Sequence, residues 1–274
     1  MANALLPKNL IEVDLSDNAF GPDGIKAFEC LLREDKHLKV LKVSNCGLGP
    51  EGGVMIAEAL GANDGLQLQT FHAGRDRLEN KGITALASVF AEMKSLQELH
   101  VPQNGIKDEG MSALITGLTT CKNLKTCRVN DNWLKNGSTE LLVGLILSAE
   151  CLEELDISDG NMGTVNVMIT LRALAAGASK IRKFGCNYND VASRKCAIEC
   201  LELLYKIESL ETIDFIGNVE SVKLQKEWKA KFEGKEIRLT EAEESDEDCS
   251  DEEDDDCDDE VDLTRLDDIC SKFD

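Results

Sequence analysis

One position in each of eight repeating segments of this 274-residue chain carries a side chain that is a candidate for contact with another molecule. These eight positions, which we call the loop row, are Asp17, Asn45, Arg75, Gln103, Asp131, Asp159, Tyr188 and Gly217. Carboxylate, amide and guanidinium groups can bind or orient the polar groups of a partner, and loops on a rigid scaffold often carry binding residues. Taken singly, each position is explained more simply as a solvated loop residue or a turn former. The spacing alone does not decide between these interpretations.

The loop row follows from a repeat with the frame LxxLxLxxN, in which each row residue directly precedes the last frame position. Copies of the frame begin at Leu10, Leu38, Leu68, Leu96, Leu124, Leu152, Ile181 and Leu210. A frame of this kind with a period of 28 to 30 residues is typical of leucine-rich repeats. The frame asparagines Asn18, Asn104 and Asn132 are interpreted as structural residues whose amides bond the turn backbone.

Each repeat is predicted to form a strand, a loop and a helix. In residues 10–15 the frame alternates as a short strand does, so Val13 and Leu15 should point inward. Beyond the strand the apolar spacing becomes helical, as at Ile25 and Phe28, which predicts outer helices of about three turns. Because one repeat cannot bury its own apolar face, neighbouring repeats must stack. We therefore expect an α/β leucine-rich repeat solenoid of the ribonuclease-inhibitor type, with eight parallel inner strands and a helix after each of the first seven.

The two ends of the array differ. Residues 221–239 depart from the frame and carry Trp228 and Phe232, so we expect them to cap the last repeat. The residues before Leu10 supply only the last turn of a helix, without a polar cap. We therefore expect that further repeats precede this start and that the array is N-terminally incomplete.

An acidic segment follows the array. Residues 241–260 hold fifteen acidic residues and no basic one, about two thirds of the net charge of −22. Such a composition buries too little apolar surface to fold, so we predict a repeat domain at residues 1–240 and a disordered tail at 241–274. Within it, Ser245 and Ser250 precede acidic residues and are candidate phosphorylation sites. The charge argues against a nucleic-acid partner, because phosphate binding requires Lys and Arg, and it permits a basic protein partner.

Signatures of catalysis or metal binding are weak. The histidines His37, His72 and His100 lie in three different repeats, and the chain has no HExxH, GxSxG or phosphate-loop motif. His72 and His100 occupy equivalent inner-face strand positions, so they could have a metal-binding or acid/base role. We favour the alternative interpretation that both are exposed residues of the strand ladder. We predict no metal site and no enzymatic activity of the chain's own.

The eleven cysteines are scattered without zinc-site spacing, and several, such as Cys127 and Cys186, fall where the frame requires a buried side chain. They are interpreted as core thiols of a protein in a reducing compartment. No stretch reaches the ~20 apolar residues of a membrane span, and the order of a signal peptide is absent. We therefore expect a soluble, intracellular protein without a membrane span.

Four strings resemble a known family. Residues 15–24 (LSDNAFGPDG), 45–50 (NCGLGP), 73–80 (AGRDRLEN) and 102–106 (PQNGI) closely resemble successive repeats of the GTPase-activating proteins for the nuclear-transport GTPase Ran. The acidic tail matches that family as well. The resemblance implies that the partner is Ran in its GTP-bound form, with Ran-binding proteins as further partners, and that the protein lies in the cytoplasm or on the cytoplasmic side of the nuclear envelope. It also implies no cofactor of the chain's own, since GTP and Mg²⁺ belong to the GTPase.

Site roles follow from the same resemblance. In that family an asparagine of the Asn-x-Gly-Leu-Gly loop orients the catalytic glutamine of Ran, and this role falls on Asn45. The arginines of the Gly-Arg-x-Arg string, Arg75 and Arg77, would contact Ran or hold the loops without acting as an arginine finger. The predicted partner-binding set is completed by Asp17, Asp76, Gln103 and Asp131.

The competing hypothesis is an acidic leucine-rich repeat scaffold without GTPase-activating activity, like the leucine-rich acidic nuclear phosphoproteins that bind histones. Repeats in that group are shorter, about 23 residues, and lack full outer helices, whereas the repeats here run 28 to 30 residues. A ribonuclease-inhibitor-like binder is a third interpretation. That class lacks the acidic tail and the Gly-Arg-x-Arg string.

Overall fold

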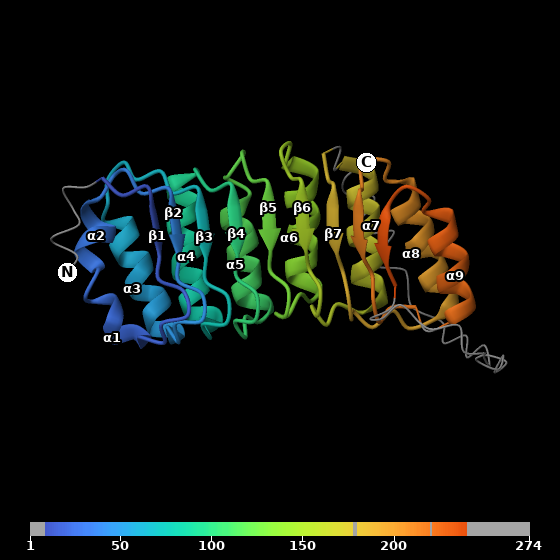
Figure 1. Cartoon of the computed structure of the whole chain (residues 1–274), viewed down its shortest axis with the longest axis horizontal. Coiled ribbons are helices and arrows are strands. Elements are labelled where there is room, and N and C mark those ends of the chain that lie inside the picture. Colours follow the sequence, from blue (N-terminus) through green and yellow to red (C-terminus); the bar gives the residue numbers. More distant parts are fainter. Residues whose placement is uncertain (1–8, 178–179, 220, 240–274) are drawn as a thin grey trace.

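A computed structural model describes residues 9–177, 180–219 and 221–239, which form one continuous array of strands and helices (Figure 1). The predictions made for the acidic tail, including Ser245 and Ser250, lie outside the described residues. The prediction of an incomplete array rests on the segment before Asn9, which is outside them as well.

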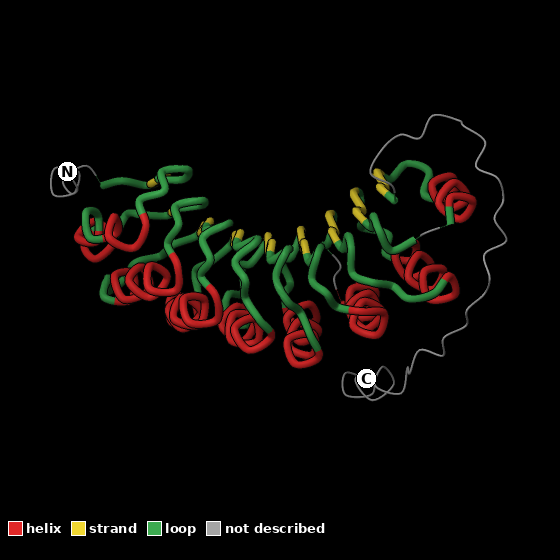
Figure 2. The backbone as a smooth tube through the Cα atoms, turned by 90° about the horizontal axis from the view of Figure 1, so that it is seen from below, coloured by secondary structure: helices red, strands yellow, loops and turns green. Residues whose placement is uncertain are grey.

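The described residues contain nine strands of three residues each in one parallel sheet, ordered β1 to β9 as along the chain. Their bounds are Glu12–Asp14 (β1), Val40–Lys42 (β2), Thr70–His72 (β3), Glu98–His100 (β4), Thr126–Arg128 (β5), Glu154–Asp156 (β6), Lys183–Gly185 (β7), Thr212–Asp214 (β8) and Glu236–Arg238 (β9). All neighbours pair in the same register, so residues at equivalent frame positions lie side by side. The sheet lines the inner side of an arc and the helices cover its outer side (Figure 2). The predicted α/β solenoid is confirmed.

A helix or a pair of helices follows each of the first eight strands within the described part of the chain. The bounds are Gly21–Ile25 (α1), Glu29–Glu34 (α2), Gly49–Gly61 (α3), Glu79–Met93 (α4), Asp108–Leu118 (α5), Asn136–Ser148 (α6), Gly163–Gly177 (α7), Arg194–Lys206 (α8) and Val222–Lys231 (α9). None of the described helices is long and apolar enough to cross a membrane.

The core runs between the sheet and the helices, where the middle residue of each strand from β1 to β8 is buried. Cysteines fill several of these core positions, and Cys127 and Cys186 are almost completely buried. Burial raises the pKa of each of these two thiols to about 12, so they remain protonated and unreactive. The interpretation of the frame cysteines as core thiols is therefore confirmed for these positions.

The first repeat differs from the prediction of a single three-turn helix. Its outer segment is divided into α1 and α2, and Phe28 between them has φ −125° and ψ 7°, outside the helical region. The Phe28 ring packs edge-to-face on Phe20, with 5.6 Å between ring centroids. The turn at Phe28 brings the two rings together and interrupts the helix.

The C-terminal end also contains more regular structure than we predicted. Residues 221–239 cover the last repeat and bury Trp228 and Phe232, as expected of a cap. However, the segment forms a further helix, α9, and a ninth strand, β9, where we had predicted eight strands. The open edge of β8 supplies backbone donors and acceptors, and residues 236–238 pair with it, with Ile237 opposite the frame residue Ile213, although Gly234 replaces the first frame leucine.

Candidate partner-binding edge

The loop row lies where each strand ends and the chain turns towards its helix. All eight row residues are exposed, and all eight have a left-handed backbone, with φ between 51° at Tyr188 and 73° at Gly217. Glycine, asparagine and aspartate adopt this conformation readily, but arginine, glutamine and tyrosine do so at a cost of about 1 kcal/mol or more. A left-handed backbone that recurs at one position of every repeat, whatever the residue type, must be imposed by the surrounding loop structure.

Buried frame asparagines next to the row residues provide that structure. The side-chain oxygen of Asn104 accepts hydrogen bonds from the backbone N–H groups of Asp76 and Leu78 in the preceding repeat. Its amide nitrogen donates to the carbonyls of Ala73, Val101 and Pro102. Asn132 makes the same pattern one repeat later. The frame asparagines thus connect successive loops, and their predicted structural role is confirmed.

Asp76 occupies the same frame position in the third repeat, and the prediction that it contacts a partner must be corrected. Its side chain is 0% exposed, and Oδ1 accepts the backbone N–H groups of Cys46 (2.8 Å) and Leu48 (3.4 Å). Oδ2 has no hydrogen-bond partner among the described residues. Burial raises the pKa of Asp76 to about 6, against the opposing effect of the backbone N–H donors. Asp76 therefore holds the Asn45 loop from beneath.

Asn45 is exposed at φ 56° in the loop that Asp76 supports. Its amide nitrogen donates a 2.9 Å hydrogen bond to Oδ1 of Asp17, the row residue of the preceding repeat. Its backbone N–H donates to the carbonyl of Gly74 at 2.7 Å. The side-chain oxygen and the second amide hydrogen have no partner in the described part of the chain, so they can bind a group from another molecule.

Arg75 and Arg77 stand on either side of the buried Asp76. Both are exposed, and both have a left-handed backbone, with φ 60° and 55°. Neither guanidinium forms an ion pair or hydrogen bond with any described residue. Two unpaired positive charges therefore lie beside the Asn45 loop on the edge of the array.

The row continues with Gln103, Asp131, Asp159, Tyr188 and Gly217. Asp131 and Asp159 are exposed neighbours, and partial burial together with the Asp131 charge raises the pKa of Asp159. Gln103, which lies between the arginines and these aspartates, is also exposed. Sequence reasoning overlooked Trp133, which is 49% exposed beside the frame residue Asn132 with the Lys107 ammonium 5.5 Å from its ring centroid. The position of this tryptophan within a polar loop could have indicated a binding residue from the sequence, because exposed tryptophans are enriched in binding surfaces.

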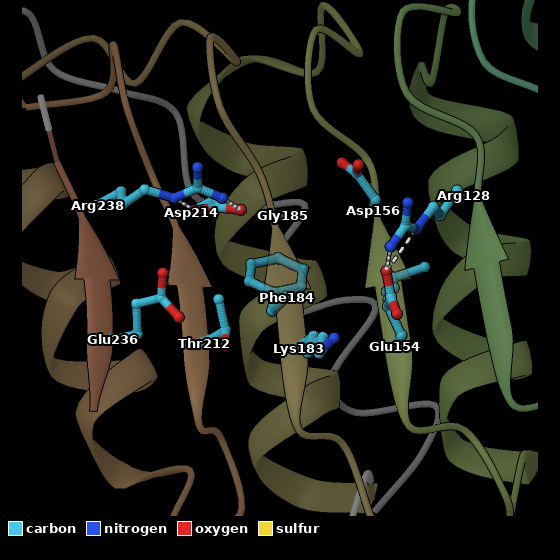
Figure 3. Close-up of a pocket in the computed structure, with 11 residues that line it drawn as sticks. Arg128, Glu154, Asp156, Lys183, Phe184, Gly185, Thr212, Asp214, Glu236 and Arg238 are labelled. Carbon is cyan, nitrogen blue, oxygen red and sulfur yellow. Dashed lines mark hydrogen bonds and ion pairs between the residues drawn. The ribbon is translucent and has the colours of Figure 1, made fainter. Parts of the chain in front are cut away.

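The inner face of the sheet carries a pocket of about 380 Å³ across β5 to β9 (Figure 3). Gly185 contributes no side chain to it, and the flanking positions in strand register are Asp156 and Asp214. Ion pairs join Arg128 to Glu154 and Asp214 to Arg238 within it. Charged and polar side chains line most of this pocket, and four of them are already joined in ion pairs, so it lacks the apolar walls of a typical small-molecule site.

The histidines that we expected to be exposed are half-buried on the same inner face. His72 and His100 lie side by side in β3 and β4, with parallel rings whose centroids are 4.0 Å apart. Glu98 Oε1 lies 2.8 Å from Nε2 of His72 and 3.2 Å from Nε2 of His100. Burial is the main reason why the pKa of His100 is lowered to about 4.

Comparison with known proteins shows which proteins the chain is similar to. The family described as Leucine Rich repeat matches residues 7–28, 34–57 and 92–114. The chain is 48% identical over 91 residues to Ran GTPase-activating protein 1 of Xenopus laevis and 45% identical over 96 residues to Ran GTPase-activating protein of Drosophila melanogaster. It is 40% identical over 82 residues to Ran GTPase-activating protein 1 of Saccharomyces cerevisiae. These alignments cover 30%, 31% and 27% of this chain, but only 16%, 16% and 20% of the relatives' own lengths.

The fold and the matched repeats define a leucine-rich repeat protein with an α/β solenoid. Within this class the chain is similar to the Ran GTPase-activating proteins, which confirms the resemblance seen in the loop strings.

Proposed function

We propose that the chain is a GTPase activator for Ran, which it binds in the GTP-bound form through the loop row. The observation that carries this proposal is the Asn45 amide, which stands exposed on a left-handed loop and is held by Asp17. The similarity to Ran GTPase-activating proteins supports the choice of partner. In this role Asn45 orients the catalytic glutamine of Ran.

Such an activator needs to contribute little chemistry of its own. Hydrolysis of GTP requires an in-line water, a metal ion and stabilisation of charge, and a GTPase supplies most of these. An asparagine amide offers an acceptor and two donors, so it can fix a glutamine side chain in one orientation. Ordering of reacting groups is worth ~7 kcal/mol or more in favourable cases. Positioning alone therefore suffices for a large acceleration, without an arginine finger.

Arg75 and Arg77 have a different role in this proposal. Their unpaired charges flank Asp76 and dock the GTPase, and Gln103 and Asp131 extend the contact along the row. A group that only docks the partner acts equally on the ground state and the transition state, so it changes affinity more than the maximal rate.

The proposal also includes the predictions about enzymatic activity, cofactors, location and further partners. The chain is not an enzyme with an active site of its own, and GTP and Mg²⁺ belong to the partner. It acts in the cytoplasm or on the cytoplasmic side of the nuclear envelope, and Ran-binding proteins are additional partners.

Single-turnover hydrolysis by GTP-loaded Ran tests the proposal directly. At saturating activator we expect Asn45→Ala to reduce the stimulated rate by about 10², equivalent to ~2.7 kcal/mol, while affinity changes much less. The matched control is Gln67→Ala, which removes an exposed amide between α3 and β3, on the opposite edge of the array. Circular dichroism of each variant shows whether the fold is retained.

Two outcomes would overturn the proposal. A wild-type saturated rate for Asn45→Ala removes the positioning role. Failure of the wild-type chain to accelerate Ran at all, together with binding to histones, favours the acidic scaffold instead.

A further inference from the structure

The cluster formed by His72, Glu98 and His100 brings three possible metal ligands together on the inner face. One ligand atom from each residue lies within 4.8 Å of the other two. The common register of β3 and β4 places the two imidazoles side by side, and Glu98 lies two residues before His100 on the same face of its strand. The cluster is thus built from rigid strand positions and not from loops.

The hydrogen bonding of this cluster is incomplete. His72 Nε2 and Glu98 Oε1 form a 2.8 Å hydrogen bond. His100 Nε2 lies 3.2 Å from the same oxygen, within ion-pair range, but it is buried and has no hydrogen-bond partner among the described residues. Two imidazole nitrogens therefore converge on one carboxylate oxygen that satisfies only one of them. A buried polar atom without a hydrogen-bond partner destabilises the fold. A ligand bound at the centre of the cluster would supply the partner that His100 Nε2 lacks.

We propose that this cluster binds a divalent transition metal ion of the zinc class. Two imidazole nitrogens and one carboxylate oxygen form a ligand set that suits zinc, with a water in the fourth position. Zinc–ligand distances are about 2.0–2.2 Å, which places tetrahedral ligand atoms about 3.3 Å apart. The two contacts of Glu98 Oε1 already have nearly this length. Because the two imidazole rings are parallel, binding also requires them to rotate about their side-chain bonds until the lone pairs of both Nε2 atoms point at the ion.

Positive groups near the cluster are neutralised by partners of their own. Lys42, on β2, pairs with Glu12 at 2.6 Å, and Arg128, on β5, pairs with Glu154. Glu98 is therefore available to a cation, and its carboxylate offsets half the charge of a divalent ion. A bound ion would connect the third and fourth repeats below the loop that carries Arg75. This inference is independent of the proposed action on Ran.

Zinc binding by the full chain tests the inference, with accessible thiols first blocked by iodoacetamide so that cysteines do not supply ligands. Equilibrium dialysis at neutral pH should show one more bound Zn²⁺ for the wild-type chain than for the double variant His72→Ala/His100→Ala. We expect each single histidine variant and Glu98→Gln to weaken binding at this site at least about tenfold. His37→Ala is the matched control, since its imidazole is 60% exposed and lies outside the cluster.

Cobalt provides a second measurement that does not depend on counting ions. Co²⁺ added to the blocked wild-type chain should give a visible d–d spectrum without a thiolate charge-transfer band, and His100→Gln, which retains a side chain of similar reach, should remove it. Equal zinc stoichiometry and affinity in the wild-type chain and the double variant would overturn the proposal. A cobalt spectrum that His100→Gln leaves unchanged would overturn it as well.

Discussion

The amide nitrogen of Asn45 lies 2.9 Å from the carboxylate of Asp17, although 28 residues separate the two in sequence. The contact joins row residues of adjacent repeats and fixes one hydrogen of the Asn45 amide. The other hydrogen and the side-chain oxygen remain available for a partner. An exposed hydrogen bond of this kind contributes little to stability, so its main effect is on the orientation of the amide.

Asp17→Ala tests this orienting role. Without the carboxylate, Asn45 can rotate, and we expect the saturated rate of stimulated GTP hydrolysis by Ran to fall by about threefold to tenfold, less than for Asn45→Ala. Asp64→Ala, which removes an exposed carboxylate on the opposite edge, provides the control for charge. Single-turnover assays at saturation measure the effect. A rate for Asp17→Ala equal to that of the control would show that the hydrogen bond has no functional role.

Arg75→Ala and Arg77→Ala separate docking from chemistry. We expect each to raise the activator concentration needed for half-maximal stimulation by about tenfold and to leave the saturated rate within about tenfold. Titration of GTP-loaded Ran with each variant gives both quantities. Loss of the saturated rate with intact binding in Arg75→Ala would mean that this residue acts as an arginine finger after all.

Asp76→Asn should stabilise the protein in a pH-dependent way. By equivalence with Asn104, Oδ2 of Asp76 occupies the place of an amide nitrogen that donates to three carbonyls. The pKa of Asp76 rises from 3.8 to about 6 on folding, so its contribution to stability is full below pH about 4 and is lost as the pH rises through about 6. The advantage of the asparagine variant should therefore grow by roughly 2–3 kcal/mol between pH 4 and pH 7.

Denaturant unfolding of both proteins across that pH range measures the difference. Other groups that titrate, among them His100, contribute equally to the two proteins and cancel. A constant difference between Asp76→Asn and the wild-type chain would show that Asp76 does not titrate in this window.

Two frame asparagines offer a matched pair for the loop-connecting hydrogen bonds. Asn132 is 1% exposed and forms five hydrogen bonds through its side chain, so Asn132→Ala should lower the free energy of unfolding by about 3–5 kcal/mol. Asn18 occupies the same frame position but is exposed and donates to only two carbonyls. Asn18→Ala should cost about 1 kcal/mol. Similar losses for the two variants would indicate that burial of the amide does not determine its contribution.

The positions of strands and loops could be predicted because a periodic frame determines them. A short strand with a buried centre, such as that around Leu99, is required at each leucine frame, and the row residues then follow by counting. The burial of Asp76 was also present in the sequence, because this residue occupies the frame position of Asn104. The prediction instead placed Asp76 in the partner-binding set together with its neighbours Arg75 and Arg77.

Other features depend on contacts between repeats. The left-handed backbone at Arg75 and Gln103 opposes the preference of these residue types, and the loop-connecting hydrogen bonds impose it. The stacking of His72 on His100 requires the shared register of β3 and β4, and that register determines which side chains become neighbours. Strand β9 carries only Ile237 and Leu239 of the frame, without its first leucine and its asparagine, and it forms because the edge of β8 is open to pairing.

The uniform backbone of the loop row makes its side chains interchangeable. Because buried neighbours set the left-handed conformation, most side chains other than glycine, asparagine and aspartate incur a similar penalty of ~1–2 kcal/mol there, and replacing one by another leaves the chain path unchanged. Each repeat therefore displays one freely chosen residue, and successive residues are spaced by the separation of parallel strands, about 4.8 Å at the sheet. The edge thus presents a regularly spaced row of side chains to a partner, one from each repeat. A partner that binds Asn45, Arg75 and Gln103 contacts the row residues of three consecutive repeats, and the rest of the solenoid fixes the spacing between them.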